Sequence, residues 1–233
     1  MPHETDCTVS VALTAGTSGS GPDAASPSHR PEAHGAGWVT RLARALSVVG
    51  HPALLMPAAV AGGAWLHGAP VRALAVGAGA TLAVSACVMA FSAWRVRAGR
   101  WQHPDASIPA ERHELNRFLL LLLLGGAVAL AAAGEGGVMA AGLGLSGGIV
   151  GLAHLLRRWM KVSLHAAFAV FSAALLWPGP PAFVLVSLLA VAVGWSRWRL
   201  GRHRAREVLT GWLAGAAAGV VVNLLAAGAA RLA

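Results

Sequence analysis

Long apolar runs with almost no charged side chains limit what this chain can fold into. Several of them reach about 20 residues, which is the length that a helix needs to cross the hydrocarbon core of a bilayer. Charge clusters or Gly/Pro turns end each run. The pattern predicts seven membrane spans, at about residues 46–66, 73–94, 118–134, 137–156, 163–177, 181–195 and 208–230.

The composition excludes an ordinary soluble domain. Of the 233 residues, 56% are hydrophobic and only 12% are charged, whereas soluble domains carry about 25% charged residues. The formal net charge of +9 does not indicate nucleic-acid binding, because the charges lie between membrane spans and not on a soluble surface. Basic loops beside membrane spans explain the charge better. The two cysteines, Cys7 and Cys87, support neither a disulfide framework nor a cysteine metal site.

The chain divides into a polar tail and an apolar domain. Residues 1–37 are rich in Ser, Thr, Gly, Pro, Ala and His and have no apolar period, which is typical of a disordered segment. Residues 38–233 are predicted to form an all-α, polytopic transmembrane bundle of six to seven helices. His51-Pro52, near the start of the first span, predicts a kink or an entry turn.

Two neighbouring spans are shorter than a full crossing. They cover 163–177 and 181–195, and the Pro/Gly-rich segment 178–181 between them predicts a tight turn. The sequence therefore leaves two alternatives open, which are two crossings or a hairpin of two short helices.

Counting the crossings places the long polar connectors on one side of the membrane. These are the segment before residue 46 and the loops 95–117, 157–162 and 196–207. All of the 18 Lys and Arg except Arg72 and Arg231 belong to that side. Because short loops rich in Lys and Arg face the cytoplasm, we expect a multi-pass protein of the cell membrane with these loops on the cytoplasmic face.

Ionisable side chains gather at three places on this side, and at membrane depth such groups indicate function. Since the three segments join the bundle from the same side, we expect them to converge into one site. The candidate residues are Asp105, Glu111, Arg112 and His113 in the first loop, Lys161, Ser163 and His165 at the start of the fifth span, and Ser196, Arg197, His203 and Glu207 before the last span.

The third cluster has a spacing that suits nucleophilic catalysis. Glu207 follows His203 by four residues, so on a helix the two side chains lie on the same face. A carboxylate there can accept the imidazole Nδ1–H, fix the tautomer and leave Nε2 as a nucleophile or base. The alternative is an Arg-rich juxtamembrane loop with an incidental His.

The three clusters together resemble the motifs of the phosphatidic acid phosphatase type 2 superfamily, over roughly residues 90 to 225. The third motif of the family, Ser-Arg-x5-His-x3-Asp, matches Ser196, Arg197 and His203, with Glu207 in place of Asp. The second, Pro-Ser-Gly-His, matches at Ser163 and His165 with Val162 and Leu164 in place of Pro and Gly. The first, Lys-x6-Arg-Pro, matches only at Arg112, because Asp105 and His113 replace Lys and Pro.

The resemblance implies a role for each matched residue. His203 would attack phosphorus to give a phosphohistidine, Glu207 would orient His203, and His165 would protonate the leaving group. Arg112, Arg197 and Ser163 would bind the phosphate oxygens. The chemistry needs no cofactor and no metal, and the sequence contains no metal-ligand spacing.

The replacement of the first-motif Lys by Asp105 removes one positive charge and adds a negative one beside the phosphate. Lys161, two residues before Ser163, can restore the cation. Alternatively, Lys161 snorkels at a helix end beside Arg157 and Arg158. Both interpretations remain open at the level of the sequence.

The leading hypothesis is an integral-membrane phosphatase that acts on a lipid-linked phosphate or pyrophosphate of polyprenyl or phosphatidyl type. Its expected partners are the lipid phosphate and the bilayer, without nucleic acid. One alternative is a catalytically silent relative that binds anionic headgroups. A small membrane transporter fits less well, because the spans carry few ionisable residues near the midplane.

Overall fold

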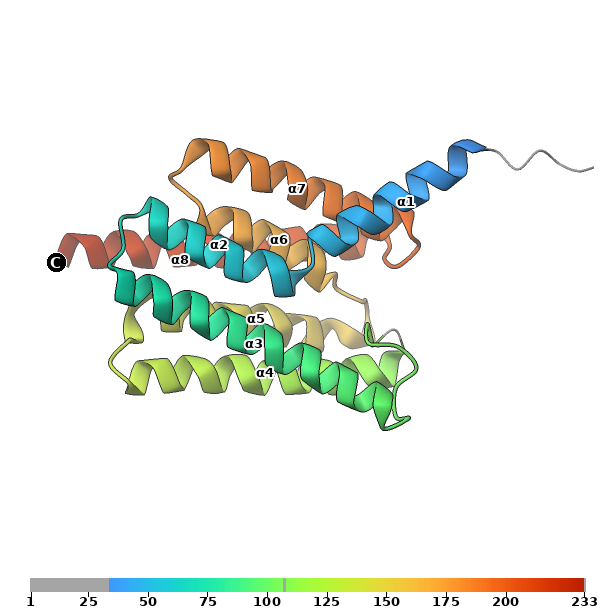
Figure 1. Ribbon diagram of the computed structural model, residues 1–233, viewed down its shortest axis with the longest axis horizontal. Coiled ribbons are helices and arrows are strands. Elements are labelled where there is room, and N and C mark those ends of the chain that lie inside the picture. The colour runs from blue at the N-terminus through green and yellow to red at the C-terminus, as the bar shows by residue number, and fades with distance from the viewer. Residues whose placement is uncertain (1–33, 107, 233) are drawn as a thin grey trace, which may run out of the picture. The chain divides into compact units, whose positions relative to one another are not determined.

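The computed structural model describes residues 34–106 and 108–232, and these are predominantly helical. Residues 1–33, most of the expected tail, lie outside the described part, and the first helix begins at His34 rather than after residue 37. No strand occurs in the described residues, so the predicted all-α fold class is confirmed. The eight α-helices (Figure 1) are α1 His34–Val49, α2 Pro52–Leu66, α3 Val71–Arg97, α4 Pro109–Ala132, α5 Ala141–Leu155, α6 Leu164–Leu175, α7 Pro180–Arg199 and α8 Ala205–Leu232.

Five helical segments are long and apolar enough to cross a membrane, which agrees with a multi-pass membrane protein. They are Val71–Arg97, Pro109–Ala132, Gly137–Arg158, Pro180–Arg199 and Ala205–Ala229. The helices Gly37–Val49 and Pro52–Leu66 are bent by 52° at the break between them. Taken together as one span, they form a sixth crossing.

The bend between α1 and α2 confirms the kink predicted at His51-Pro52. Proline disfavours the helical conformation in the residue before it, and His51 is extended with φ −67° and ψ 131°. The Nδ1 atom of His51 accepts a hydrogen bond from the backbone N–H of Ala53 at 3.2 Å and so caps the start of α2.

The two spans that were expected to be short differ in length in the structure. The helix expected at 181–195 extends over Pro180–Arg199 and is long enough to cross, because Arg197 and Arg199 continue its last turn at the basic end. The helix expected at 163–177 is only Leu164–Leu175, and its 12 residues rise about 18 Å, short of the roughly 30 Å hydrocarbon thickness. α6 can be short because protein surrounds much of it, and Ala166, Ala167 and Phe171 are fully buried.

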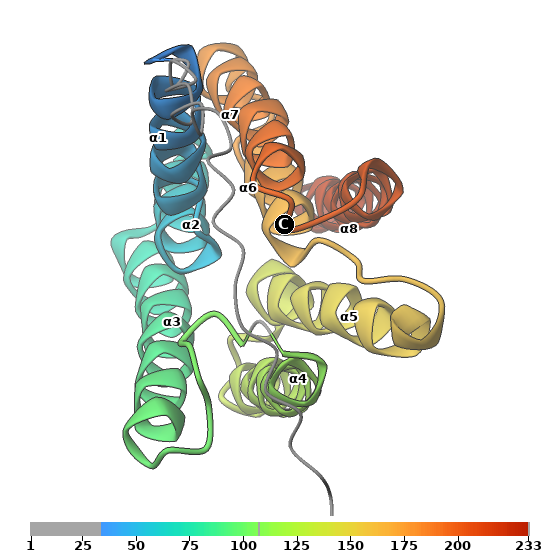
Figure 2. The same ribbon diagram turned by 90° about the vertical axis from the view of Figure 1, so that its right-hand side faces the viewer.

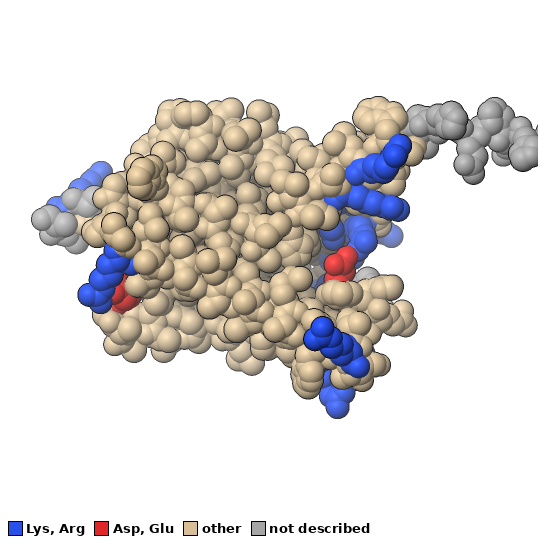
Figure 3. Space-filling model, viewed as in Figure 1, with Lys and Arg blue, Asp and Glu red and all other residues tan. Residues whose placement is uncertain are grey.

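The helices from α2 to α8 run alternately in opposite directions (Figure 1). The connectors that join α3 to α4, α5 to α6 and α7 to α8 therefore lie at one end of the bundle, as predicted, whereas the α1–α2 break lies further inside and α1 continues towards that end (Figure 1). Blue Lys and Arg side chains gather at the same end in the space-filling view (Figure 3), whereas Arg72 pairs with Glu135 at the other end.

A row of glycines brings α8 against the centre of the bundle. Viewed from the basic end, α6 lies between α2 and α3 on one side and α8 on the other (Figure 2). A Cβ atom at Gly211 would lie 2.5 Å from the carbonyl oxygen of Ser163, and one at Gly215 would collide with the backbone of Ala167. Such close backbone approach is a common way for helices to pack in lipid. It places the start of α8 beside the start of α6.

Candidate functional site

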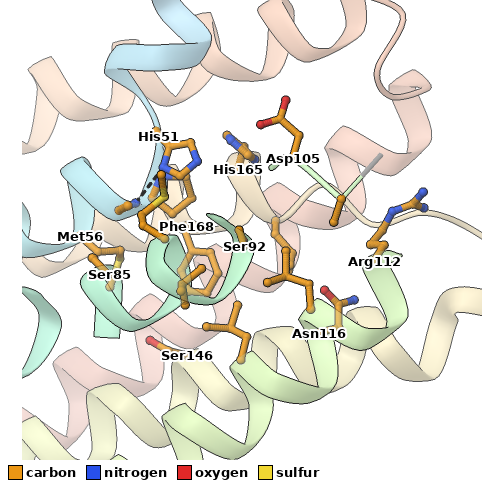
Figure 4. A pocket seen from close by; sticks show the side chains of 18 of the residues that line it. His51, Met56, Ser85, Ser92, Asp105, Arg112, Asn116, Ser146, His165 and Phe168 are labelled. Carbon is orange, nitrogen blue, oxygen red and sulfur yellow. Dashed lines mark hydrogen bonds between the residues drawn. The ribbon is translucent and has the colours of Figure 1, made fainter. Parts of the chain in front are cut away.

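A cavity of about 250 Å³ opens at the basic end of the bundle, between α2, α3, α4, α5 and α6. Its lining has two chemically different parts (Figure 4). Aliphatic and aromatic side chains such as Met56, Leu119 and Phe168 line the part inside the bundle. The ionisable side chains of the lining are His51, Asp105, Arg112, Lys161, His165, Arg197, Arg202 and His203.

Five of the seven predicted site residues line this one cavity, although they come from three distant stretches of the chain. Arg112 belongs to the first turn of α4, Lys161 to the segment before α6, and His165 to the first turn of α6. Arg197 lies near the end of α7, and His203 lies in the connector between α7 and α8. The expected convergence of the three clusters is thus confirmed for these residues.

The imidazole of His203 is held in one tautomer. Its Nδ1 atom lies 3.1 Å from the carbonyl oxygen of Lys161 and 3.2 Å from Oε2 of Glu207. Both neighbours are acceptors, so Nδ1 carries the proton and donates it, and Nε2 keeps its lone pair. Burial lowers the pKa of His203, and the positive charges of Lys161 and Arg197 lower it further. The ring is therefore neutral at pH 7, which is the state that a nucleophile needs.

Glu207 is itself fixed by the backbone around it. As the third residue of α8, its carboxylate accepts from the backbone N–H of Arg204 at 3.1 Å, as in a capping box. Its other oxygen accepts from the backbone N–H of Lys161 at 3.4 Å. Glu207 does not line the cavity, and its contact with Nδ1 of His203 is the one that the spacing predicted.

Four Lys and Arg side chains line the cavity, namely Arg112, Lys161, Arg197 and Arg202. Burial lowers the pKa of Lys161 to about 8, and the positive charges of Arg112 and Arg197 contribute to the shift. The Nζ atom of Lys161 donates to the carbonyl oxygen of Arg202 at 3.1 Å. Nη1 of Arg197 donates to Oγ of Ser47 at 2.9 Å, and its buried Nε has no hydrogen-bond partner among the described residues. Positive charges gathered at one cavity favour an anionic ligand.

Ser163 lies in a different position from the other predicted phosphate-binding residues. It is fully buried, and its Oγ accepts from the backbone N–H of Ala166 at 3.5 Å, which caps the start of α6. Its own backbone N–H donates to the carbonyl oxygen of Glu207 at 3.1 Å. Ser163 is not among the cavity-lining residues, so its contact with phosphate stays a prediction.

Asp105 lies at the cavity with its negative charge already paired. Its Oδ2 accepts from Nη1 of Arg202 at 2.9 Å, and both side chains are partly exposed. The loop that carries Asp105 is anchored on α4, because the backbone N–H of Gln102 donates to Oε1 of Glu111 at 2.8 Å and Trp101 donates to Glu114 at 3.1 Å. Glu111, one of the candidates in this loop, therefore holds the loop in place.

The sequence pattern missed two ionisable residues of the cavity, His51 and Arg202. The rings of His51 and His165 meet edge to face with centroids 5.0 Å apart. Because Nδ1 of His51 accepts from Ala53, its Nε2 carries the proton and is a donor. The signal for His51 was its position beside Pro52 at the basic end of a span, which we interpreted only as a kink.

Among the described residues, no group of three or more His, Cys, Asp or Glu has an arrangement suited to a metal ion. The cavity lining instead combines the imidazoles of His51, His165 and His203 and several cations with an apolar interior. Such a set can bind an anionic headgroup and deliver a nucleophile to it. No family model, curated protein or solved structure matches this chain.

Proposed function

We propose that this protein is an integral-membrane phosphatase of the phosphatidic acid phosphatase type 2 kind, which hydrolyses a lipid-linked phosphate or pyrophosphate. The observation that carries the proposal is the presence of two acceptors beside Nδ1 of His203. Two acceptors, the carbonyl oxygen of Lys161 and the carboxylate of Glu207, hold the proton on Nδ1. This arrangement prepares Nε2 for attack in a cavity lined by Arg112, Lys161 and Arg197.

The reaction proceeds in two balanced steps. In the first, Nε2 of His203 bonds to phosphorus, the bond from phosphorus to the leaving oxygen breaks, and His165 gives that oxygen a proton. In the second, water attacks the phosphohistidine while His165 takes a proton from the water, and inorganic phosphate and free His203 result. The negative charge of the bound phosphate favours the protonated form of His165 that the first step needs.

The cations stabilise the charge that spreads over the three equatorial phosphate oxygens. Phosphoryl transfer depends mostly on such positioning and neutralisation. Lys161 lines the cavity and bonds to the backbone of Arg202, which supports a phosphate-binding role over snorkelling towards the membrane surface. Asp105, which replaces the first-motif Lys, brings a negative charge that would repel phosphate. Its ion pair with Arg202 offsets this charge and so supports phosphate binding in the cavity.

The lipid part of the substrate is inferred from the interior of the cavity. Below the ionisable groups, the walls contributed by α3, α4 and α6 include Val88, Leu119 and Phe168. Apolar walls that continue from an anion-binding end suit a headgroup attached to a hydrocarbon chain. We further propose that the site faces the cytoplasm of the cell membrane, because the Lys and Arg lie mainly at that end of the bundle.

Phosphate release by the purified, detergent-solubilised protein tests the proposal. The substrates are a panel of lipid phosphates and pyrophosphates, measured with and without vanadate. We expect release that vanadate inhibits, because vanadate imitates the transferring phosphoryl group. Binding of the lipid phosphates without any phosphate release would instead support the catalytically silent alternative. For that alternative, the cations of the cavity are enough to bind an anionic headgroup.

A further inference from the structure

The side chain of Asn116 is a buried amide beside the cavity. Asn116 is only 5% exposed and lines the cavity from α4. Its Oδ1 atom has no hydrogen-bond partner among the described residues. Figure 4 shows its side chain next to Arg112, at the edge of the space between α3 and α4. A buried acceptor without a donor is energetically costly in an apolar setting. A ligand that donates a hydrogen bond to Oδ1 would remove this cost.

Two other polar groups of the cavity lining, Thr81 and Ser146, differ from Asn116. The hydroxyl of Thr81 donates to the carbonyl oxygen of Gly77 in its own helix at 2.9 Å. The hydroxyl of Ser146 donates to the carbonyl oxygen of Gly142 at 2.9 Å in the same way. Both hydroxyl groups are therefore hydrogen-bonded within their own helices, as is common for Ser and Thr in membrane spans. Asn116 differs from them because its Oδ1 is an acceptor without a donor among the described residues.

The register of α4 relates Asn116 to the phosphate site. The cavity-lining residues Arg112, Asn116, Leu119 and Leu123 follow one another on one face of the helix. Four residues separate Arg112 from Asn116, which is a rise of about 6 Å along the axis. Beyond Asn116 the face is aliphatic. A phosphate near Arg112 therefore places the next few atoms of the substrate at Asn116 and the hydrocarbon beyond them at the leucines.

We propose that Asn116 recognises a hydroxyl group on the backbone of the lipid, close to the phosphate. A hydroxyl can donate to Oδ1 and accept from Nδ2 of the same amide. The substrate class is then a single-chain lipid phosphate with a free hydroxyl near the phosphate, and a prenyl phosphate is disfavoured because its chain is hydrocarbon from the first carbon. This proposal rests on the proposed function and selects among its substrates.

Two matched lipids test the proposal. One is a monoacylglycerol 3-phosphate with a free 2-hydroxyl, and the other is the monoacyl propane-1,3-diol phosphate with the same acyl chain and no hydroxyl. In the unsubstituted protein, we expect kcat/KM to be about tenfold higher for the lipid with the hydroxyl, which is the order expected for one buried hydrogen bond. Asn116→Leu should remove this preference, so that the ratio of the two kcat/KM values falls to about one.

The matched control is Leu119→Ala, which changes the same face of α4 one turn deeper. It should lower kcat/KM for both lipids by the same factor. An unchanged preference in Asn116→Leu, or an equal loss for both lipids, would overturn the role of Asn116. Hydrolysis of neither lipid by the unsubstituted protein would instead count against the proposed phosphatase. In that case, the affinities of the unsubstituted protein for the two lipids would be compared by quenching of tryptophan fluorescence. Equal affinities would refute the proposed recognition of the hydroxyl by Asn116.

Discussion

The ring nitrogen Nδ1 of His203 lies 3.1 Å from the backbone carbonyl oxygen of Lys161, 42 residues earlier in the chain. This contact joins the segment before α6 to the connector before α8. It also means that the tautomer of His203 depends partly on a backbone atom, which no side-chain substitution at Lys161 removes. The ammonium of Lys161 therefore contributes a positive charge to the cavity lining, and the carbonyl oxygen of Lys161 independently accepts from His203.

His203→Ala should reduce hydrolysis by about 10³-fold or more, because it removes the nucleophile. Glu207→Gln should be milder, at roughly tenfold, because the Lys161 carbonyl still accepts from Nδ1 and only the charge that favours the imidazolium is lost. Initial rates of phosphate release check both values, with thermal unfolding as the control for folding. Full activity in His203→Ala would rule out the phosphohistidine mechanism.

Lys161→Met should weaken the binding of inorganic phosphate or vanadate by about tenfold, since the lost ammonium lies among other cations at the cavity. Arg158→Met is the matched control, because Arg158 is also basic, lies three residues away and is exposed outside the cavity lining. The measurement is the dissociation constant by isothermal titration calorimetry. Equal effects of the two substitutions would support snorkelling of Lys161.

The affinity for inorganic phosphate should fall as the pH rises above about 8. The pKa of Lys161 is lowered to about 8, so the free protein loses this charge above that pH. A bound anion raises the pKa again, so the affinity falls by up to about tenfold per pH unit until the pKa of the complex is reached. Lys161→Arg should abolish this fall, because a guanidinium stays protonated. Calorimetric titrations between pH 7 and pH 10 check the prediction, and an unchanged profile in Lys161→Arg would contradict it.

Gly215→Ala should destabilise the protein by about 1–3 kcal/mol, because its Cβ would collide with the backbone of Ala167 and force α8 away from α6. The same displacement should reduce activity, since α8 carries Glu207. Gly228→Ala in the same helix is the control, because no neighbouring atom lies within 4 Å of its added Cβ. Thermal unfolding in detergent compares the two variants. A melting temperature that falls equally in both would show that the close approach at Gly215 is unimportant.

Two introduced cysteines should report the orientation in the membrane. Ala98 and His67 are exposed residues that cap the ends of α3 and α2, at opposite ends of the bundle, and both have negative φ angles. In a background without Cys7 and Cys87, a membrane-impermeant thiol reagent on intact cells should label His67→Cys and should reach Ala98→Cys only after lysis. The reverse pattern would place the site on the outer face.

Much of the architecture was predictable from the sequence by itself. Apolar runs of about 20 residues specify helices in a bilayer, because no other local structure satisfies the backbone there. The spacing of His203 and Glu207 predicted their contact on the assumption that both lie on a helix, whereas His203 lies in the connector just before α8. The order of the spans predicted that Arg112, Lys161 and Arg197 share one end of the bundle.

Only the tertiary structure decided how far each helix extends and which groups complete the cavity. α6 is short because α8 and other helices cover it, and the glycines that permit this contact have a meaning only in the packed bundle. The pairing of Asp105 with Arg202 and the edge-to-face contact of His51 with His165 join residues about a hundred positions apart. The lack of a partner for Oδ1 of Asn116 among the described residues likewise depends on how the helices around the cavity pack. Such relationships arise from packing between distant segments, which no local pattern in the chain encodes.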